Sequence, residues 1–183
     1  MTSSPSTVDA KARARLSEGS LAGAWLLDGA HSTVGLRSKT VWGLVPVKGN
    51  FAQISGEGVI SPAGVVSGSI RLASASIDTN SKKRDAHLRS VDFFNSDVYP
   101  HITFAVDHVD VTAEAASAVG TLEVAGRKRP LEVPVSVTAS ADDTVELDAA
   151  IKVDRSDFGL TWNQLGMVSM KNTITIHAVF TRN

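Results

Sequence analysis

Apolar residues recur at every second position in three long stretches of the second half of this chain. These positions are Leu131, Val133, Val135 and Val137, then Val145, Leu147, Ala149, Ile151 and Val153, and finally Ile174, Ile176, Ala178 and Phe180. A period of two residues is typical of a β-strand with one buried face, because successive side chains of a strand point to opposite faces. The chain is therefore predicted to be mainly β, with a sheet that buries one face.

Shorter alternating segments fill much of the rest of the chain, and turns rich in Gly, Ser and Pro separate them. Asp28-Gly29 predicts a hairpin turn between the first two strands, and Pro46 within residues 41–47 favours an edge strand or a bulged loop. About eight strands with one mid-chain helix indicate an antiparallel meander rather than βαβ units. Such a sheet closes into a barrel or folds into a sandwich, and a barrel of this size can enclose a ligand cavity.

The composition limits which functions are open to the chain. Its 183 residues, 43% of them hydrophobic, are enough for one domain with its own core. The 18 basic and 19 acidic residues leave a formal net charge of −1, so no overall positive field favours nucleic acid. The sequence contains no cysteine, which excludes disulfides, thiolate metal sites and cysteine nucleophiles.

The N-terminal segment differs from the rest in being polar. Residues 1–20 are expected to form a tail that is disordered or contains a short helix over residues 8–16, whereas residues 21–183 form the β domain. Neither a signal-peptide apolar run nor a stretch of roughly 18 apolar residues occurs in the sequence. We therefore expect a cytoplasmic protein without a membrane span.

Residues 77–104 hold an unusual concentration of charged and aromatic side chains. The charged ones are Lys82, Lys83, Arg84, Asp85, His87, Arg89 and Asp92, and the aromatic ones are Phe93, Phe94, Tyr99 and Phe104. This segment interrupts the alternating pattern on either side of it. It predicts a short helical insertion near residues 82–98 that covers or gates one end of the sheet.

Several short motifs occur along the chain, namely Trp25 to Asp28 with His31-Ser32, Gly49-Asn50-Phe51, Ser76 to Asn80, Arg84 to Ser90, Asp92-Phe93-Phe94 with Tyr99 to Phe104, and Asp154 to Leu160. In their order and spacing they resemble the motifs of the YceI-like family of lipocalin-like, polyisoprenoid-binding proteins. The resemblance implies an eight-stranded antiparallel lipocalin-like barrel that binds a long isoprenoid, such as a polyprenyl phosphate or a quinone-like lipid, for carriage, storage or sensing.

The inward-facing apolar residues allow two interiors, a core filled by side chains or an elongated apolar tunnel. A prenyl chain in a tunnel would gain roughly 25 cal/mol per Å² of apolar surface removed from water. The resemblance favours the tunnel. A filled core would instead fit a structural or stress-related dimer.

The charged segment also allows two roles. In the first, Arg84 and His87 face a phosphate or quinone head group, since a guanidinium can donate two hydrogen bonds at once to a phosphate. Phe93 and Phe94 then seal the apolar chain of the ligand. In the second, Arg84 and Asp85 pair with Asp154, Arg155 or Asp157 and hold the helix against the barrel end, since buried charges need partners. We favour the second role for Arg84, Asp85 and Arg155.

The chain contains few signs of catalysis. Its five histidines, His31, His87, His101, His108 and His177, have no HExxH-like spacing, so we expect neither a metal site nor a cofactor. Asp28, His31 and Ser32 lie in a predicted hairpin without a nucleophile elbow, which favours a structural cap. The remaining enzymatic alternative is a reaction on an isoprenoid or other apolar substrate with Arg84, Asp85 and His87 as the acid–base group.

Large apolar residues in predicted loops complete the candidate site. Trp42, Trp162, Met167 and Met170 either frame the opening, form a homodimer contact or pack in the core. The predicted ligand-binding residues are Trp42, Arg84, His87, Phe93, Phe94, Phe104, Phe158, Trp162, Met167 and Met170. The expected partner is an isoprenoid or other long apolar ligand, with no catalytic residue.

Overall fold

A computed structural model of the chain describes residues 6–40, 44–112, 115–141, 143–163 and 166–183. Within these residues the strands are β1 (Gly23–Leu27), β2 (Thr33–Thr40), β3 (Val45–Phe51), β4 (Ile54–Ile60), β5 (Val66–Ala73), β6 (Ile77–Asp78), β7 (His101–Val111), β8 (Ala116–Val124), β9 (Arg127–Ala141), β10 (Thr144–Asp154) and β11 (Lys171–Arg182). The helices are α1 (Ala10–Ser17) and α2 (Lys82–Arg89), and the 3₁₀ turns are η1 (Ser74–Ser76) and η2 (Arg155–Phe158).

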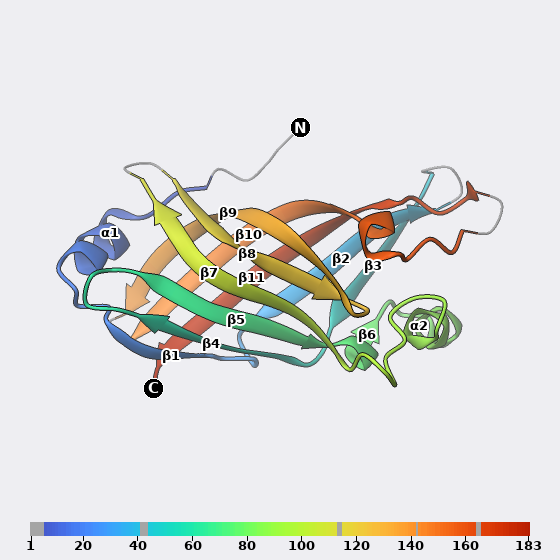
Figure 1. Cartoon of the computed structure of the whole chain (residues 1–183), viewed down its shortest axis with the longest axis horizontal. Helices are drawn as coiled ribbons and strands as arrows, with labels where there is room; N and C mark the ends of the chain where they lie inside the picture. The colour runs from blue at the N-terminus through green and yellow to red at the C-terminus, as the bar shows by residue number, and fades with distance from the viewer. Residues whose placement is uncertain (1–5, 41–43, 113–114, 142, 164–165) are drawn as a thin grey trace.

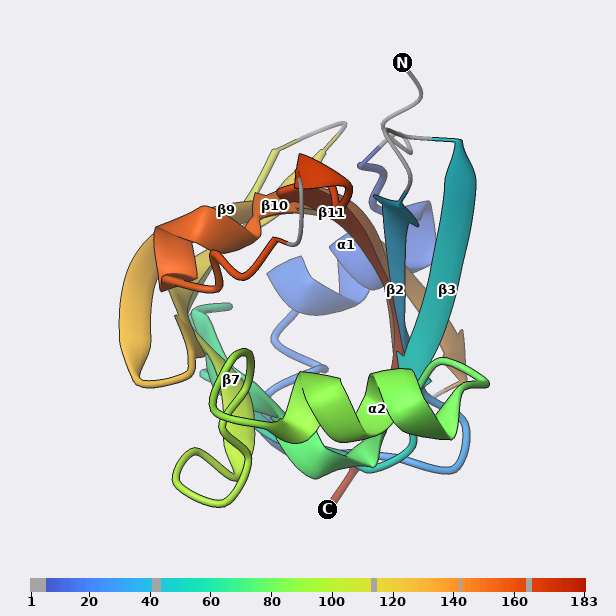
Figure 2. The ribbon, with the colours of Figure 1, turned by 90° about the vertical axis from the view of Figure 1, so that its right-hand side faces the viewer.

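The strands form a closed antiparallel barrel (Figures 1 and 2). In the described residues the ring runs β1-β4-β5-β7-β8-β9-β10-β11 and closes through the pairing of β11 with β1, which makes eight strands. The predicted eight-stranded barrel is therefore confirmed. Closure satisfies the backbone hydrogen bonds of strands that would otherwise be edges.

Three of the barrel strands are bent and continue beyond the ring as a second segment. β2 extends β1, and both pair with the same edge of β11, through Leu27 with Phe180 and through Thr33 with His177. β3 and β6 likewise continue the paths of β4 and β5, and they pair with β2 and with β3. The barrel is thus extended at the end that carries β6 and α2.

The predicted hairpin at Asp28-Gly29 is wrong, because β1 and β2 run one after the other along β11. The intervening bend is held locally. The Asp28 carboxylate accepts hydrogen bonds from the backbone N–H groups of Ala30 (3.0 Å) and His31 (3.3 Å). The Ser32 hydroxyl donates to the Asp28 carbonyl (2.7 Å) and accepts from the N–H of Val179 (2.9 Å). Asp28 and Ser32 are therefore structural, as predicted.

Pro46 lies where a missing backbone N–H is tolerated. It is opposite Lys39 of β2, whereas β6 pairs with β3 only at Asn50 and Phe51. The outer side of β3 at Pro46 lies beyond this short β6 pairing, so the edge-strand prediction agrees with the structure.

The two helices lie at opposite ends of the barrel (Figures 1 and 2). Asp9 caps α1 by accepting from the N–H of Ala12 (2.5 Å), and Ser81 caps α2 by accepting from that of Arg84 (3.4 Å). The helical insertion predicted near residues 82–98 is confirmed in position. The helix itself ends at Arg89, and hydrogen-bonded turns continue to the start of β7.

The pairing of β7 with β8 depends on a glycine. The register shifts between Val106 and His108, next to the pair of Val106 with Gly120, and the Ala105 carbonyl lies close to Gly120. A Cβ added to Gly120 would lie 2.0 Å from that oxygen, a distance that requires the backbone to move.

We predict that Gly120→Ala lowers the free energy of unfolding by about 2 kcal/mol, as measured by urea denaturation. Gly58→Ala is the matched control, because a Cβ there meets the Ser67 carbonyl at 3.6 Å, an ordinary contact. The explanation would be wrong if both substitutions changed stability equally.

Candidate functional site

The barrel encloses two adjoining cavities. One of about 260 Å³ lies toward α2, and one of about 160 Å³ lies toward α1. They share the lining residues Ile70, Phe104, Val133 and Ile176. A water molecule needs only about 10–15 Å³ of such space. The interior therefore contains unfilled space in two cavities that adjoin at these four residues, and we refer to the two together as the tunnel. This finding argues against a barrel filled by side chains.

The alternating residues of the sequence build the tunnel wall. Every one of the thirteen apolar positions named in β9, β10 and β11 lines one or both cavities, from Leu131 to Val137, from Val145 to Val153 and from Ile174 to Phe180. Apolar atoms make up almost the whole wall. Such a surface stabilises an apolar ligand through removal from water rather than through directed hydrogen bonds.

Arg84 and Asp85 hold α2 against the end of the barrel through a single residue, Thr79. The Asp85 carboxylate, only 6% exposed, accepts from the Thr79 N–H (3.0 Å) and hydroxyl (2.5 Å). Arg84 donates from Nε to the Thr79 hydroxyl (2.7 Å) and from Nη2 to its carbonyl (2.6 Å). The structural role predicted for Arg84 and Asp85 agrees with this arrangement, but the predicted partners were wrong.

Three rings meet across the α2 end of the tunnel. The His87 ring lies edge-on to Trp162, with 4.4 Å between centroids, and edge-on to Phe93 at 5.1 Å. Phe93 and Trp162 are 5.8 Å apart. His87 Nε2 also lies 3.1 Å from a carboxylate oxygen of Asp92. Because Trp162 follows η2, these contacts join the α2 segment to the segment after η2.

Arg155 is a buried cation beside the same rings. It is 6% exposed and lies with its guanidinium carbon 5.5 Å from the Phe93 centroid. Its side chain donates to three carbonyl oxygens, those of Leu160, Trp162 (2.9 Å) and Ser169 (3.1 Å). Burial lowers the pKa of this guanidinium from its ordinary value, and the charge of Asp154 partly opposes the effect.

One nitrogen of Arg155 makes no hydrogen bond to the described residues. This nitrogen, Nη2, is buried. Arg155 and Arg84 both line the α2-side cavity, whose wall is mostly apolar, and neither lines the α1-side cavity. The α2 end of the tunnel can therefore accept the oxygen atoms of a polar head group.

The predicted ligand-binding residues fall into three groups. Those that line the α2-side cavity are Arg84, His87, Phe93, Phe94, Phe104, Phe158 and Trp162. Met167 and Met170 are half-buried, and neither belongs to the described lining of the two cavities. Trp42 lies outside the described residues.

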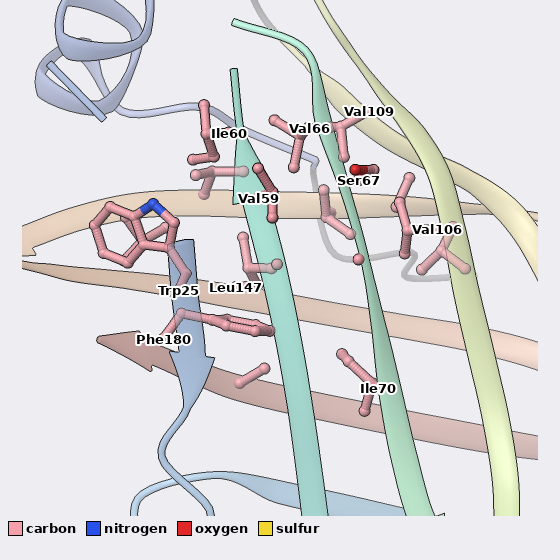
Figure 3. Close-up of a pocket in the computed structure, with 18 of the residues that line it drawn as sticks. Trp25, Val59, Ile60, Val66, Ser67, Ile70, Val106, Val109, Leu147 and Phe180 are labelled. Atoms are coloured by element: carbon pink, nitrogen blue, oxygen red, sulfur yellow. The ribbon is translucent and has the colours of Figure 1, made fainter. Parts of the chain in front are cut away.

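The sequence analysis missed the opposite end of the tunnel. Trp25 and Phe180 line the α1-side cavity together with residues from the N-terminal segment, and Figure 3 shows their rings beside Leu147 and Ile60. Trp25 and Phe180 both lie at apolar positions of an alternating pattern, which could have identified them as inward-facing. The tail of residues 1–20 carried no comparable pattern, so its place in the wall could not be found.

The titratable groups do not form a recognisable catalytic arrangement in the described part of the chain. His31, His108 and His177 each lie beside an aspartate, Asp28 (2.8 Å), Asp110 (3.5 Å) and Asp148 (2.9 Å), at exposed or half-exposed positions. Across the described ranges, no group of three His, Asp or Glu side chains is placed to hold a metal ion. Arg84 and Asp85 both bond to Thr79. His87 lies against Asp92, Phe93 and Trp162 instead, so these three side chains do not form an acid–base group.

The comparisons with known proteins agree with the barrel. The family model described as the YceI-like domain matches residues 25–180. The chain belongs to the YceI-like family. The match leaves residues 1–24, with α1, outside the domain that the family model describes.

Relatives of this YceI-like chain match it over part of its length. A UPF0312 protein of Staphylococcus aureus (strain MSSA476) is 29% identical over 145 residues, which are 75% of this chain and 82% of that protein. Protein YceI of Shigella flexneri is 29% identical over 112 residues, 58% of each chain.

Two solved structures share the fold. BcnA of Burkholderia cenocepacia superimposes with a TM-score of 0.76 at 25% identity, covering 84% of this chain and 98% of that one. A polyisoprenoid binding domain from Saccharophagus degradans, implicated in plant cell wall breakdown, gives 0.72 at 17% identity, covering 87% and 98%. At 17% identity the second likeness concerns the fold alone.

We predict that Asp85→Ala destabilises the protein by about 2–3 kcal/mol in urea denaturation, because it leaves the buried Thr79 N–H without an acceptor. Asp97→Ala is the control, since Asp97 is an exposed carboxylate in the turns between α2 and β7. Equal stability of the two variants would contradict the proposed anchoring through Thr79.

The pKa of Asp154 is lowered, and the main cause is the hydrogen bond from the Ser156 hydroxyl. The backbone N–H of Ser156 and the charges of Lys171 and Arg155 lower this pKa further, whereas burial raises it. The contribution of Asp154 to folding is therefore present above its unfolded pKa and is lost as pH falls through the lower folded value. We predict that Ser156→Ala raises the pKa of Asp154 toward its ordinary value in an NMR titration. An unchanged pKa would exclude this cause.

Proposed function

We propose that this protein binds a long isoprenoid lipid in the barrel and carries, stores or senses it without chemical change. The observation that carries the proposal is the apolar tunnel with guanidinium groups at one end only. A linear apolar molecule fits an elongated wall of Val, Ile, Leu and Phe side chains. The name of the Saccharophagus degradans neighbour, a polyisoprenoid binding domain, supports this ligand class.

The head group lies at the α2 end in this proposal. Arg84 and Arg155 line the cavity there, and a nitrogen of Arg155 has no partner among the described residues. A buried cation bonded only to carbonyl oxygens and to an aromatic face favours an added acceptor. A polyprenyl phosphate or a quinone-like lipid supplies such oxygens.

An enzymatic role has less support. Asp85 accepts two hydrogen bonds from Thr79 within the anchor of α2, whereas His87 lies against Trp162, Phe93 and Asp92. The proposed binding function needs no proton transfer between these groups. It therefore assigns them to the closure of the tunnel.

Location and assembly remain predictions. Neither described helix, α1 or α2, has the length and apolar character needed to cross a membrane. A cytoplasmic location and a homodimer built around the loops at the mouth are still expected from the sequence. Cell fractionation and light scattering would test them.

The binding test begins with the wild-type protein, purified without detergent and extracted for lipid mass spectrometry. We expect a co-purified isoprenoid, and Val133→Phe should reduce its amount because Val133 lines both cavities and is 3% exposed. Val65→Phe is the control at an exposed turn position. A wild-type protein that neither carries an apolar lipid nor binds added prenyl alcohols would refute the proposed function.

A second test concerns the head group. We predict that the wild type binds a prenyl phosphate at least about tenfold more tightly than the prenyl alcohol of equal chain length. Arg155→Met should remove most of this preference, whereas Arg127→Met, at an exposed hairpin position, should keep it. If the wild type bound the prenyl phosphate and the prenyl alcohol equally well but bound a prenyl quinone more tightly, the site would instead be one for a neutral head group.

A further inference from the structure

The segment of residues 7–22 lies across the α1 end of the tunnel. Val8, Ala12, Leu16 and Leu21 of this segment line the α1-side cavity, and α1 is visible behind the interior when the barrel is viewed from the α2 end (Figure 2). In Figure 3 the helix lies beyond Trp25 and Ile60. Although this segment is polar in overall composition, four of its apolar side chains face the α1-side cavity.

The start of this segment is joined to β9 by backbone hydrogen bonds. The N–H of Asp9 donates to the Val137 carbonyl (3.0 Å), and the N–H of Val137 donates to the Thr7 carbonyl (2.8 Å). The Asp9 carboxylate also accepts from the N–H of Ala139 (3.2 Å). These contacts fix the beginning of α1 to the barrel wall.

The end of the segment is joined to β1 and β11. Arg182 donates to the carbonyls of Ala22 (2.7 Å) and Ser20 (2.8 Å), and its guanidinium carbon lies 4.8 Å from the Trp25 centroid. The Trp25 indole N–H donates to the Leu21 carbonyl (3.0 Å). Because both ends of the segment are hydrogen-bonded to the barrel, α1 is held in a fixed position as part of the tunnel wall.

The length of the tunnel limits how long a bound ligand can be. On β10, lining residues run from Val145 at the α1 side to Val153 at the α2 side, eight residue steps or about 26 Å along the strand. The tilt of barrel strands reduces this to about 20 Å along the barrel axis. A ligand whose head group lies at the α2 end therefore points its tail at α1.

We propose that residues 7–22 form a stop that limits the length of the bound chain, with Ala12 as the specificity-determining residue. Ala12 is 2% exposed and lines the cavity from the middle of α1. The inference rests on the proposed function, and it adds a length limit set by a segment outside the family match of residues 25–180. A larger side chain at this position shortens the space for the tail, and a smaller one at Leu16 lengthens it.

The test uses a series of linear prenyl alcohols of increasing length, with binding followed by the fluorescence of Trp25 and Trp162. We expect the wild type to bind members up to a limit. Ala12→Phe should weaken binding of the longest accepted member about tenfold or more and leave the shortest unchanged, because only the distal part of the tail is displaced. Leu16→Ala should extend the limit to a longer member.

Ala14→Phe is the matched control, because Ala14 is an exposed alanine of the same helix and the substitution is identical. A folded Ala12→Phe variant with the wild-type length profile would overturn the inference, as would equal binding of every length by the wild type. If Ala12→Phe does not fold, an unchanged limit in Leu16→Ala overturns it instead. A wild type that binds no member refutes the proposed function itself, which is a different result from binding without a length limit.

Discussion

The backbone pairing of β11 is the interaction on which the rest of the structure depends. β11 pairs with β10 along one edge and with both β1 and β2 along the other. This pairing closes the barrel, so its inward side chains surround an enclosed space instead of covering a flat sheet. The bend between β1 and β2 allows one strand to be shared by two neighbours, and it lengthens the barrel toward α2.

Closure produces an interior with two different ends. Toward α1 the wall is apolar and is completed by residues 7–22. This segment is joined to β9 by backbone hydrogen bonds and to β11 by the Arg182 guanidinium, which donates to two of its backbone carbonyls. Toward α2 the side chains of Asp85 and Arg155 are buried, and that of Arg84 is half-buried. Charges in such a place need hydrogen-bond partners, and Thr79 and the carbonyls after η2 supply them. This asymmetry orients a ligand that has one polar end.

Much of the fold was predictable because a period of two residues assigns each side chain to a face. The inward positions of β9, β10 and β11, the barrel and the place of the helical insertion all follow from local pattern or from the YceI-like motifs. The predicted hairpin at Asp28 was wrong because a turn signal says where the chain bends but not which strands pair. Arg84 and Asp85 were given wrong partners for a related reason, since Thr79 is an uncharged residue and invites no ion-pair prediction.

The sequence by itself determined which residues can face an apolar interior and where the charged segment lies, because periodicity and residue chemistry are local properties. Only the tertiary structure decided that the interior holds unfilled space and that α1 lies across its far end. Cavity size depends on how far apart the strands are held, and α1 is anchored largely through backbone groups that every residue possesses. Such contacts leave almost no mark on the sequence, although they set the limits of the space in which a ligand would lie.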